Sequence, residues 1–411
     1  MLDRRWKKML RSHKALLAIV LSLLSTSALV HTEELFRFTY REGDQYRILS
    51  NVDQTVTVDG TFSHRANMLN RIAITVDEVD NGRGRFSVVY QHSAESTGLY
   101  AVHQFDREYE SRFWRDERGL YEIEPHYFVP VVRDVPVFPD YALSPGDSWT
   151  HVGSEVHDLR EGYGIRDAFH FPINVNYIYL GQREWDGEMW PAFSVRYNIS
   201  HRPSRTYRAA LYPVRISGFS DQIMYWDPGF GRARAYQEEY EIVLSLSNGQ
   251  TVQFAGTASA EVIESTPLDR QRVREEIARD IDELGILDTT VSEDERGVTL
   301  TLENIQFPPD SAELVASERE KLRRIALILN RYPERDVLIT GHTALAGTEA
   351  GRQLLSEQRA AAVGEFLLAM GVRERDRMMF RGVGATQPIA DNRTEAGMRR
   401  NRRVEITILD N

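Results

Sequence analysis

A period-two alternation of apolar and polar side chains over residues 35–262 constrains the fold of this chain more than any other feature. Successive side chains of a strand point to opposite faces of a sheet, so this alternation predicts half-buried strands. The clearest runs are centred on Phe36 to Tyr40, Ile72 to Val76, Phe86 to Tyr90, Ile173 to Tyr179, Phe193 to Ile199 and Tyr240 to Leu246. The region contains no convincing amphipathic helix. We therefore predict an antiparallel all-β region, either a sandwich or an incomplete barrel.

Three short connections between these runs contain the residue types that are typical of β-hairpin turns. They are Asp80-Asn81-Gly82-Arg83-Gly84, Trp185-Asp186-Gly187-Glu188 and Ser247-Asn248-Gly249-Gln250. Asn, Asp and Gly tolerate the positive φ angles that tight hairpins need. Each connection is therefore predicted to join two neighbouring antiparallel strands.

Prolines crowd the middle of the β-rich region. They are Pro125, Pro130, Pro136, Pro139 and Pro145. Proline lacks the N–H that a central strand donates to its neighbours, so this segment is predicted to be an extended edge or a crossing between two halves. The expected division is a first half at 31–147 and a second half at 148–265.

After residue 265 the pattern changes to alternating strands and helices, which predicts an α/β domain over residues 266–411. Thr266 and Pro267 resemble a helix N-cap and first turn, and Gly285 resembles a stop. The further elements expected are strands near 291, at 298–302, 337–340, 378–381 and 404–409, and helices at 311–330 and from about 347 to 370.

The strand at 337–340 ends in a polar loop, Gly341-His342-Thr343-Ala344, and a long helix follows. Ligand sites of α/β folds tend to lie at such strand ends. On that helix Arg359 falls beside the apolar stripe of Leu355, Phe366 and Met370. A guanidinium there needs an anionic partner, which is either an internal carboxylate or the carboxylate of a ligand.

Five segments resemble, in the same order, the signature of the OmpA-like peptidoglycan-binding domain family. They are Asn304-Ile305-Gln306-Phe307, Thr340-Gly341-His342-Thr343, Leu355-Ser356-Glu357-Gln358-Arg359-Ala360, Gly382-Val383-Gly384 and Asn401-Arg402-Arg403-Val404-Glu405-Ile406. The resemblance covers residues 267–411, and no family is recognised for the β-rich region. It implies non-covalent binding of the peptidoglycan stem peptide, with diaminopimelate held between an aspartate and an arginine. By this resemblance Arg359 matches the family arginine, Arg402 matches a second site position and Thr343 lies in the site loop.

Ala344 departs from the family pattern, because the resemblance places an aspartate at this position. The ligand ammonium would lose its counter-charge, at a cost of about 1 to 3 kcal/mol. We therefore expect weakened or altered binding unless another acid, for which Glu349 is the nearby candidate, takes the role. A wall with different stem chemistry and a different ligand both remain open.

The first thirty residues carry a basic start and then an apolar segment from Ala15 to Val30, the pattern of a secretory signal peptide. The segment is short for a membrane-spanning helix. We expect an exported protein in the periplasm or at the periplasmic face of the outer membrane, with peripheral membrane association if any. An uncleaved anchor is the alternative.

Composition excludes several classes of function. The chain has no cysteine, so disulfides, thiolate metal sites and a lipid-bearing cysteine are excluded. With 50 basic and 61 acidic side chains among 411 residues the net charge is −11, which argues against nucleic-acid binding. The cluster Arg399, Arg400, Arg402 and Arg403 is interpreted as a solvated helix end before the last strand.

No catalytic motif, metal-ligand pattern or cofactor loop is found, so we expect no catalytic residues, no metal and no cofactor. The leading hypothesis is a non-catalytic envelope protein that contacts peptidoglycan and uses the β-rich region as a second interaction module, for which an envelope protein is the expected partner. One alternative is an assembly protein whose C-terminal domain docks another protein instead. The other is an outer-membrane β-barrel with a periplasmic domain, which the charged tract at 106–124 disfavours.

Overall fold

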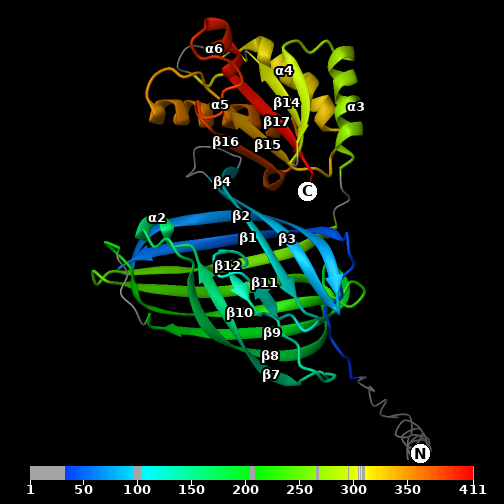
Figure 1. Ribbon diagram of the computed structural model, residues 1–411, viewed down its shortest axis with the longest axis vertical. Coiled ribbons are helices and arrows are strands. Elements are labelled where there is room, and N and C mark those ends of the chain that lie inside the picture. The colour runs from blue at the N-terminus through cyan, green and yellow to red at the C-terminus, as the bar shows by residue number, and fades with distance from the viewer. Residues whose placement is uncertain are drawn as a thin grey trace, which may run out of the picture.

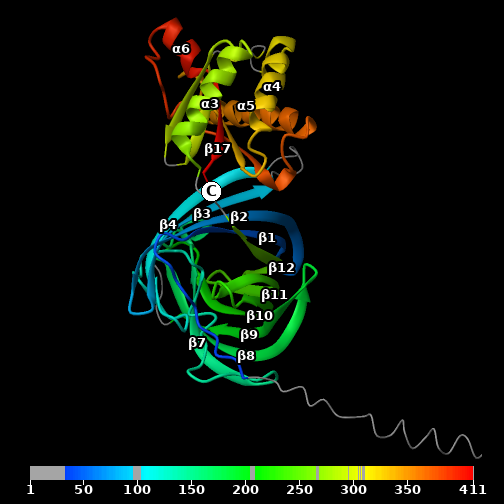
Figure 2. The same ribbon diagram turned by 90° about the vertical axis from the view of Figure 1, so that its right-hand side faces the viewer.

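The structure is a computed structural model, which describes residues 33–95, 103–203, 209–264, 268–294, 296–303, 305, 307 and 311–410. The predicted signal peptide at 1–30 lies outside the described residues. A strand-rich region occupies one end of the molecule and an α/β domain the other (Figures 1 and 2). Among the described residues, no helix combines the length and apolar character needed to cross a bilayer.

The β-rich region is one curved sheet, in which neighbouring strands are antiparallel. Its strands are β1 (Gln45–Val58), β2 (Thr61–Asp80), β3 (Arg83–Glu95), β4 (His103–Arg115), β5 (Tyr121–Ile123), β6 (Val132–Arg133), β7 (Ser148–His157), β8 (Phe169–Trp185), β9 (Glu188–His201), β10 (Pro213–Asp227), β11 (Arg232–Leu246) and β12 (Thr251–Glu264). β1 pairs with both β2 and β12, so the first and last strands of the region lie side by side. The predicted all-β region is confirmed, as one incompletely closed sheet (Figure 2).

An aromatic core fills the concave side of this sheet. Phe36 is 4% exposed, and its ring centroid lies 4.9 Å from that of Phe193 and 5.0 Å from that of Tyr179. Phe38 and Phe138 each lie 4.8 Å from Trp226. The prediction of a strand around Phe36 is wrong, because residues 35–41 have no strand conformation. The alternation instead marks an extended segment that inserts its aromatic rings into the core.

The hairpin predictions hold where backbone angles can be compared. Asn81 and Gly82 have φ of 49° and 78°, and Asp186 and Gly187 have 50° and 78°. The proline-rich segment contains only the short strands β5 and β6, as expected of a crossing. The division at residue 147 stays a prediction, since strands on both sides of it belong to the same sheet.

Several strands lie outside the runs named from the sequence, among them β1, β4, β7 and β10. β4 is notable because it runs through the first part of the charged tract at 106–124. Asp106, Glu108 and Glu110 are exposed, whereas Phe105 and Phe113 are buried. Charged residues therefore occupy the solvent face of an ordinary half-buried strand.

The C-terminal domain is α/β, as predicted. Its elements are α3 (Arg270–Glu283), β13 (Thr289–Asp294), β14 (Gly297–Glu303), α4 (Ala316–Leu329), β15 (Val337–Gly341), α5 (Glu349–Ala369), β16 (Met378–Gly382), α6 (Glu395–Asn401) and β17 (Arg403–Leu409). The strand order is β13-β14-β17-β15-β16, with only β15 and β16 parallel. The helices pack on this sheet around a separate core that includes Val273, Leu322, Ile339, Val363 and Ile406.

Three details differ from the predicted elements. The N-cap of α3 is Asp269, whose side chain accepts a hydrogen bond from Arg272 N, and not Thr266. The helix expected at 311–330 begins only at Ala316, after an irregular segment. The seven-residue helix α6 was not predicted as a separate element, although its last turn carries Arg399 and Arg400 as the helix-end interpretation required.

The two regions contact each other along β16. Met379 and Phe380 pair with His103 and Gln104 of β4 in parallel, so β4 extends the sheet of the C-terminal domain. Phe105 packs there with Leu338, Met379 and Leu409. Beside this contact the buried Asp336 accepts hydrogen bonds from Arg47 and Arg71 of the β-rich region at 3.3 and 2.9 Å.

Candidate ligand site at the end of β15

Two glycines bring helix α5 onto the ends of β15 and β16. A Cβ atom on Gly341 would lie 2.1 Å from the carbonyl oxygen of Ser356, and one on Gly382 would lie 2.4 Å from Glu357 N. Ser356 Oγ accepts a hydrogen bond from Gly384 N at 2.9 Å and donates one to Gln353 O at 2.7 Å. Because only glycine permits this approach, the helix turn before Arg359 is fixed against both strand ends.

The loop after β15 is buried at its start. Thr343 and Ala344 are 6% and 5% exposed, and Thr343 N donates to Gly384 O at 2.8 Å. Leu345 N donates to Asn392 Oδ1 at 3.0 Å. These backbone contacts hold the loop in one conformation beside the segment that leads into α6.

Asn401 supports this loop through the side chain of Asn392. Its amide nitrogen donates to Asn392 Oδ1 and Ala390 O, both at 2.9 Å, while its Oδ1 accepts from Ile389 N and Ala390 N. The side chain is fully buried. Reasoning from the sequence missed this role, although Asn401 opens the last of the five segments.

Arg359 lies on α5, three residues after Ser356, and is 9% exposed. Its Nε donates to Ser311 O at 3.3 Å, and its Cζ lies 4.9 Å from the centroid of the Phe307 ring. A cation stacked on an aromatic face is held in a fixed orientation.

Arg359 is buried, but the predicted stripe is wrong: Leu355 and Phe366 are half-buried and Met370 is 40% exposed. The buried face of α5 is formed instead by residues such as Ala360, Val363 and Leu367.

Arg402 lies at the junction of α6 and β17, where its Nη2 donates to Glu395 Oε1 at 3.1 Å. Its side chain is 35% exposed. The next residue reaches the loop directly, since His342 N donates to Arg403 O at 3.0 Å. β15, α5 and the start of β17 thus bring Thr343, Ala344, Arg359 and Arg402 to one end of the sheet.

A charged group underlies the loop. Glu405 Oε2 lies 3.3 Å from His342 Nε2, and Arg403 Nε donates to Glu405 Oε1 at 2.8 Å. Burial opposes ionisation of Glu405, but hydrogen bonds and charges from His342 and Arg403 outweigh it and lower its pKa to about 2. Burial in turn lowers the pKa of His342. The ion pair of Arg403 and Glu405 therefore underlies the loop at neutral pH.

Glu349, the acid considered as a substitute for the missing aspartate, is exposed at the start of α5. Arg359 lies ten residues further along the helix, which corresponds to about 15 Å at 1.5 Å per residue. Glu349 is therefore remote from the guanidinium. Whether it reaches the other end of a bound ligand stays a prediction.

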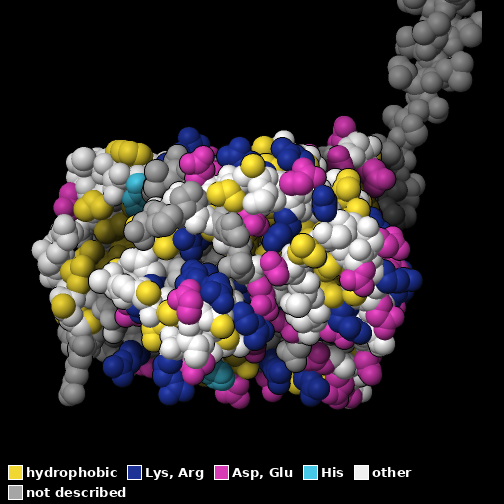
Figure 3. Space-filling model, turned by 90° about the horizontal axis from the view of Figure 1, so that it is seen from above, with side chains coloured by type: hydrophobic (Ala, Val, Ile, Leu, Met, Phe, Trp, Pro, Cys, Tyr) yellow, Lys and Arg dark blue, Asp and Glu magenta, His cyan; other side chains and the backbone are white. Residues whose placement is uncertain are grey.

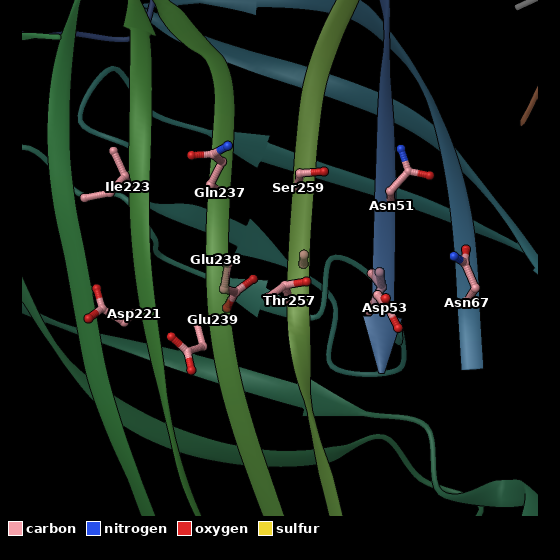
Figure 4. Close-up of a pocket in the computed structure, with 12 residues that line it drawn as sticks. Asn51, Asp53, Asn67, Asp221, Ile223, Gln237, Glu238, Glu239, Thr257 and Ser259 are labelled. Atoms are coloured by element: carbon pink, nitrogen blue, oxygen red, sulfur yellow. The ribbon is translucent and has the colours of Figure 1, made fainter. Parts of the chain in front are cut away.

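The β-rich region offers a second, shallower site. A depression of about 440 Å³ lies on β1, β2 and β10 to β12 (Figure 4). Asn51, Ser259, Gln237 and Ile223 form one row of paired positions across it, and Asp53, Thr257, Glu239 and Asp221 form the next. Asp53 and Asp221 are engaged by Arg65 and Arg196. The row of uncharged polar side chains is left facing the depression.

The elements around β15 define an α/β domain with a buried loop and a buried arginine at one end of its sheet. Residues 306–402 match the OmpA family, so the C-terminal part of this chain contains an OmpA family domain. The β-rich region lies outside this match.

Curated relatives each match about a quarter of the chain. The probable lipoprotein YiaD of Escherichia coli is 37% identical over 105 residues, which are 26% of this chain and 48% of that protein. The peptidoglycan-binding protein ArfA of Mycobacterium tuberculosis is 40% identical over 104 residues, or 25% of this chain and 32% of that protein. The chain thus spans less than half the length of either relative.

Two solved structures match nearly all of their own chains but only a part of this one. An outer membrane protein from Borrelia burgdorferi is 36% identical and matches 29% of this chain and 96% of its own, with a TM-score of 0.25. The cell wall anchor of the type VI secretion system from Pseudomonas aeruginosa is 30% identical and matches 34% of this chain and 99% of its own, with a TM-score of 0.30.

Proposed function

We propose that this protein is a non-catalytic, exported envelope protein whose OmpA-like domain contacts the stem peptide of peptidoglycan. The observation that carries the proposal is the buried, oriented guanidinium of Arg359 beside the Thr343 loop. A planar guanidinium binds a carboxylate through two parallel hydrogen bonds. The name of the relative ArfA, a peptidoglycan-binding protein, supports the same ligand.

The position of the site in the molecule favours contact with an extended polymer. Asp336, at the start of β15, faces the β-rich region, whereas the loop with Thr343 follows the opposite end of the strand. The loop contacts Asn392 near α6, which lies on the side away from the β-rich region (Figure 1). On the outer face of this domain basic and acidic side chains are interspersed (Figure 3).

Ala344 sets the expected strength of the interaction. An aspartate here would supply the counter-charge for a ligand ammonium, and alanine cannot. We therefore propose weak binding to diaminopimelate-containing wall, with Arg359 as the main contact and Arg402 and Thr343 beside it. Periplasmic localisation follows, because peptidoglycan lies in that compartment.

Sedimentation of residues 33–411 with purified diaminopimelate-containing sacculi tests the proposal. Arg359→Ala should reduce binding about tenfold or more, which corresponds to about 1.4 kcal/mol. Arg323→Ala is the control, because Arg323 is an exposed helix arginine paired with Glu320 in the same domain. Equal losses in both variants would exclude a specific role for Arg359.

Restoring the family aspartate gives a second test. Ala344→Asp should strengthen binding about tenfold by pairing the ligand ammonium. Leu345→Asp is the matched control, since it adds the same charge one residue away on a side chain that is 58% exposed. If Ala344→Asp folds normally and changes nothing while the wild type does not bind, the alternative of a protein-docking domain is favoured.

For the β-rich region we propose an interaction with an envelope protein through the polar depression. Its support is the row of Asn51, Ser259 and Gln237, whose amides and hydroxyl can exchange hydrogen bonds with a partner. A photo-crosslinker at Gln237 should give a discrete adduct in intact cells that is lost on Ser259→Arg. The same crosslinker at Met189, which is 61% exposed and outside the depression, is the control. Identical adducts from both positions would refute this assignment.

A further inference from the structure

A second cavity lies where the two regions meet, separate from the strand-end site. Its volume is about 610 Å³. Its walls come from β1, β2 and β12 on one side and from α3, the α4–β15 connection and the short 3-10 turn Arg375–Arg377 before β16 on the other. Both regions therefore contribute side chains to it. Five of the side chains that line it are arginines: Arg47, Arg71, Arg272, Arg335 and Arg377.

The arginines share few buried acids. Asp336 pairs with Arg47, Arg71 and Arg377 at 3.3, 2.9 and 3.0 Å. Behind the cavity, Asp410 pairs with Arg270 at 3.1 Å and lies 3.9 Å from Arg335. Arg335 also lies 3.6 Å from the exposed Glu334. Of these carboxylates only that of Asp336 is buried, and Asp410 is half-buried.

The other acidic side chains that line the cavity are more exposed to water than Asp336 is. Glu261, Asp269 and Glu334 are exposed, and only Asp376 is half-buried. Water screens exposed carboxylates strongly, whereas charges inside the junction act through a medium of low polarity. The junction is therefore positive at its floor, although the whole chain carries a net charge of −11.

This arrangement has an energetic consequence. Arg47, Arg71 and Arg335 are 9%, 3% and 6% exposed, and buried cations in excess of buried anions repel one another. Burial lowers the pKa of both Arg47 and Arg71, and the neighbouring arginines add to this while Asp336 opposes it. An anion in the cavity would relieve that repulsion.

We propose that the junction cavity binds a phosphate group, held by Arg47 and Arg71 of the β-rich region together with Arg335 and Arg377 of the OmpA-like domain. A doubly charged tetrahedral oxyanion suits several converging guanidinium groups better than a single carboxylate does. The cavity also exceeds the size of a free phosphate ion, so the group can belong to a larger molecule. The sources that share this chemistry are inorganic phosphate and the phosphomonoester headgroup of phosphatidic acid.

The first arm of the test is calorimetric titration of the full mature chain with inorganic phosphate at constant ionic strength. One bound phosphate per chain is expected, and Arg47→Gln should weaken it at least tenfold. Arg323→Gln removes an equal charge from exposed surface and should leave the affinity unchanged. Absence of binding at 10 mM phosphate, or equal effects of both substitutions, overturns the proposal for this group.

The second arm uses a soluble short-chain phosphatidic acid with phosphate as competitor. Tighter binding of the lipid, displaced by phosphate, identifies a headgroup as the source, and tighter binding of phosphate identifies the free ion. If Arg47→Gln disturbs the fold, Arg377→Gln decides, because Arg377 is one of the four proposed ligands and its side chain is 30% exposed. It should weaken binding about threefold, and an unchanged affinity there overturns the proposal. Sacculus sedimentation is independent of both arms, so this site and the strand-end site can fail separately.

Discussion

The two regions of this molecule differ in how far apart in the sequence their defining residues lie. In the OmpA-like domain, the residues of the candidate site are supplied by short sequence segments that pack against one another, such as Gly341 under Ser356. In the β-rich region the core joins residues far apart in the chain, as Phe36 contacts Phe138, Phe193 and Trp226. Short motifs can therefore identify the first region, whereas the second has a recognisable pattern but no recognisable function.

The comparison also shows where charge is placed. The OmpA-like domain buries ionic groups both under its loop, at Glu405, and at the junction, at Asp336. The concave side of the β-rich sheet is filled mainly by aromatic and aliphatic side chains. Ionic contacts therefore position the loop after β15 and the two regions relative to each other. Burial of apolar side chains stabilises the curved sheet around its core.

The largest expected effect comes from removing the acid between the regions. Asp336→Ala leaves buried guanidinium groups without their shared carboxylate and should cost about 3–5 kcal/mol. All tryptophans lie before residue 227, so urea unfolding followed by tryptophan fluorescence reports the β-rich region, and helical circular dichroism reports the other. The two curves should coincide in the wild type and separate in the variant. Asp391→Ala is the control, because Asp391 forms an exposed pair with Arg393. A loss of less than about 1 kcal/mol in the free energy of unfolding of Asp336→Ala would contradict the role given to the junction.

The aromatic core gives the next effect. Phe36→Ala should destabilise the β-rich region by about 3–4 kcal/mol, because a large buried ring leaves a cavity. Leu35→Ala, one residue away at a side chain that is 56% exposed, should change stability by less than about 0.5 kcal/mol. Urea denaturation measures both. Equal effects would show that residues 35–41 are not part of the core.

The lowered pKa of Glu405 predicts that the stability of the OmpA-like domain depends on pH. Its pKa is lowered from 4.5 to about 2, so its stabilisation is present above about pH 4.5 and is lost as the pH falls towards 2. Glu405→Gln should therefore cost about 2–3 kcal/mol at pH 7, and the difference from the wild type should vanish near pH 2. Denaturant titrations across this range measure it. Glu320→Gln removes an exposed charge as the control, and a pH-independent difference for Glu405→Gln would rule out the linkage.

The smallest effect concerns local turn chemistry in the β-rich region. Gly60 joins β1 to β2 with φ of 75°, and no atom would contact an added Cβ within 4 Å. Gly60→Ala should thus cost only about 1 kcal/mol, from backbone strain. Gly60→Asn should cost less, since asparagine tolerates positive φ. Thermal unfolding resolves the two, and a larger loss for asparagine would contradict the assignment to backbone strain.

The fold was predictable where sequence signals are local. The hairpin at Asn81-Gly82, the strand starting at Val337 and the burial of Arg359 follow from turn chemistry and spacing. The helix α6 was missed because seven residues give too short a periodic signal. The partner of Arg359 at Ser311 and the support of the loop by Asn401 depend on packing between distant segments, which spacing in one sequence does not reveal.

The pairing of β4 with β16 has a consequence for handling the protein. An unpaired outer strand displays a row of hydrogen-bonding groups that invites other chains to add to the sheet. Here two residues of β4 cover that border of the OmpA-like domain. A fragment cut at residue 267 would uncover it together with Met379 and Leu338, and we expect such a fragment to self-associate where the complete chain stays dispersed.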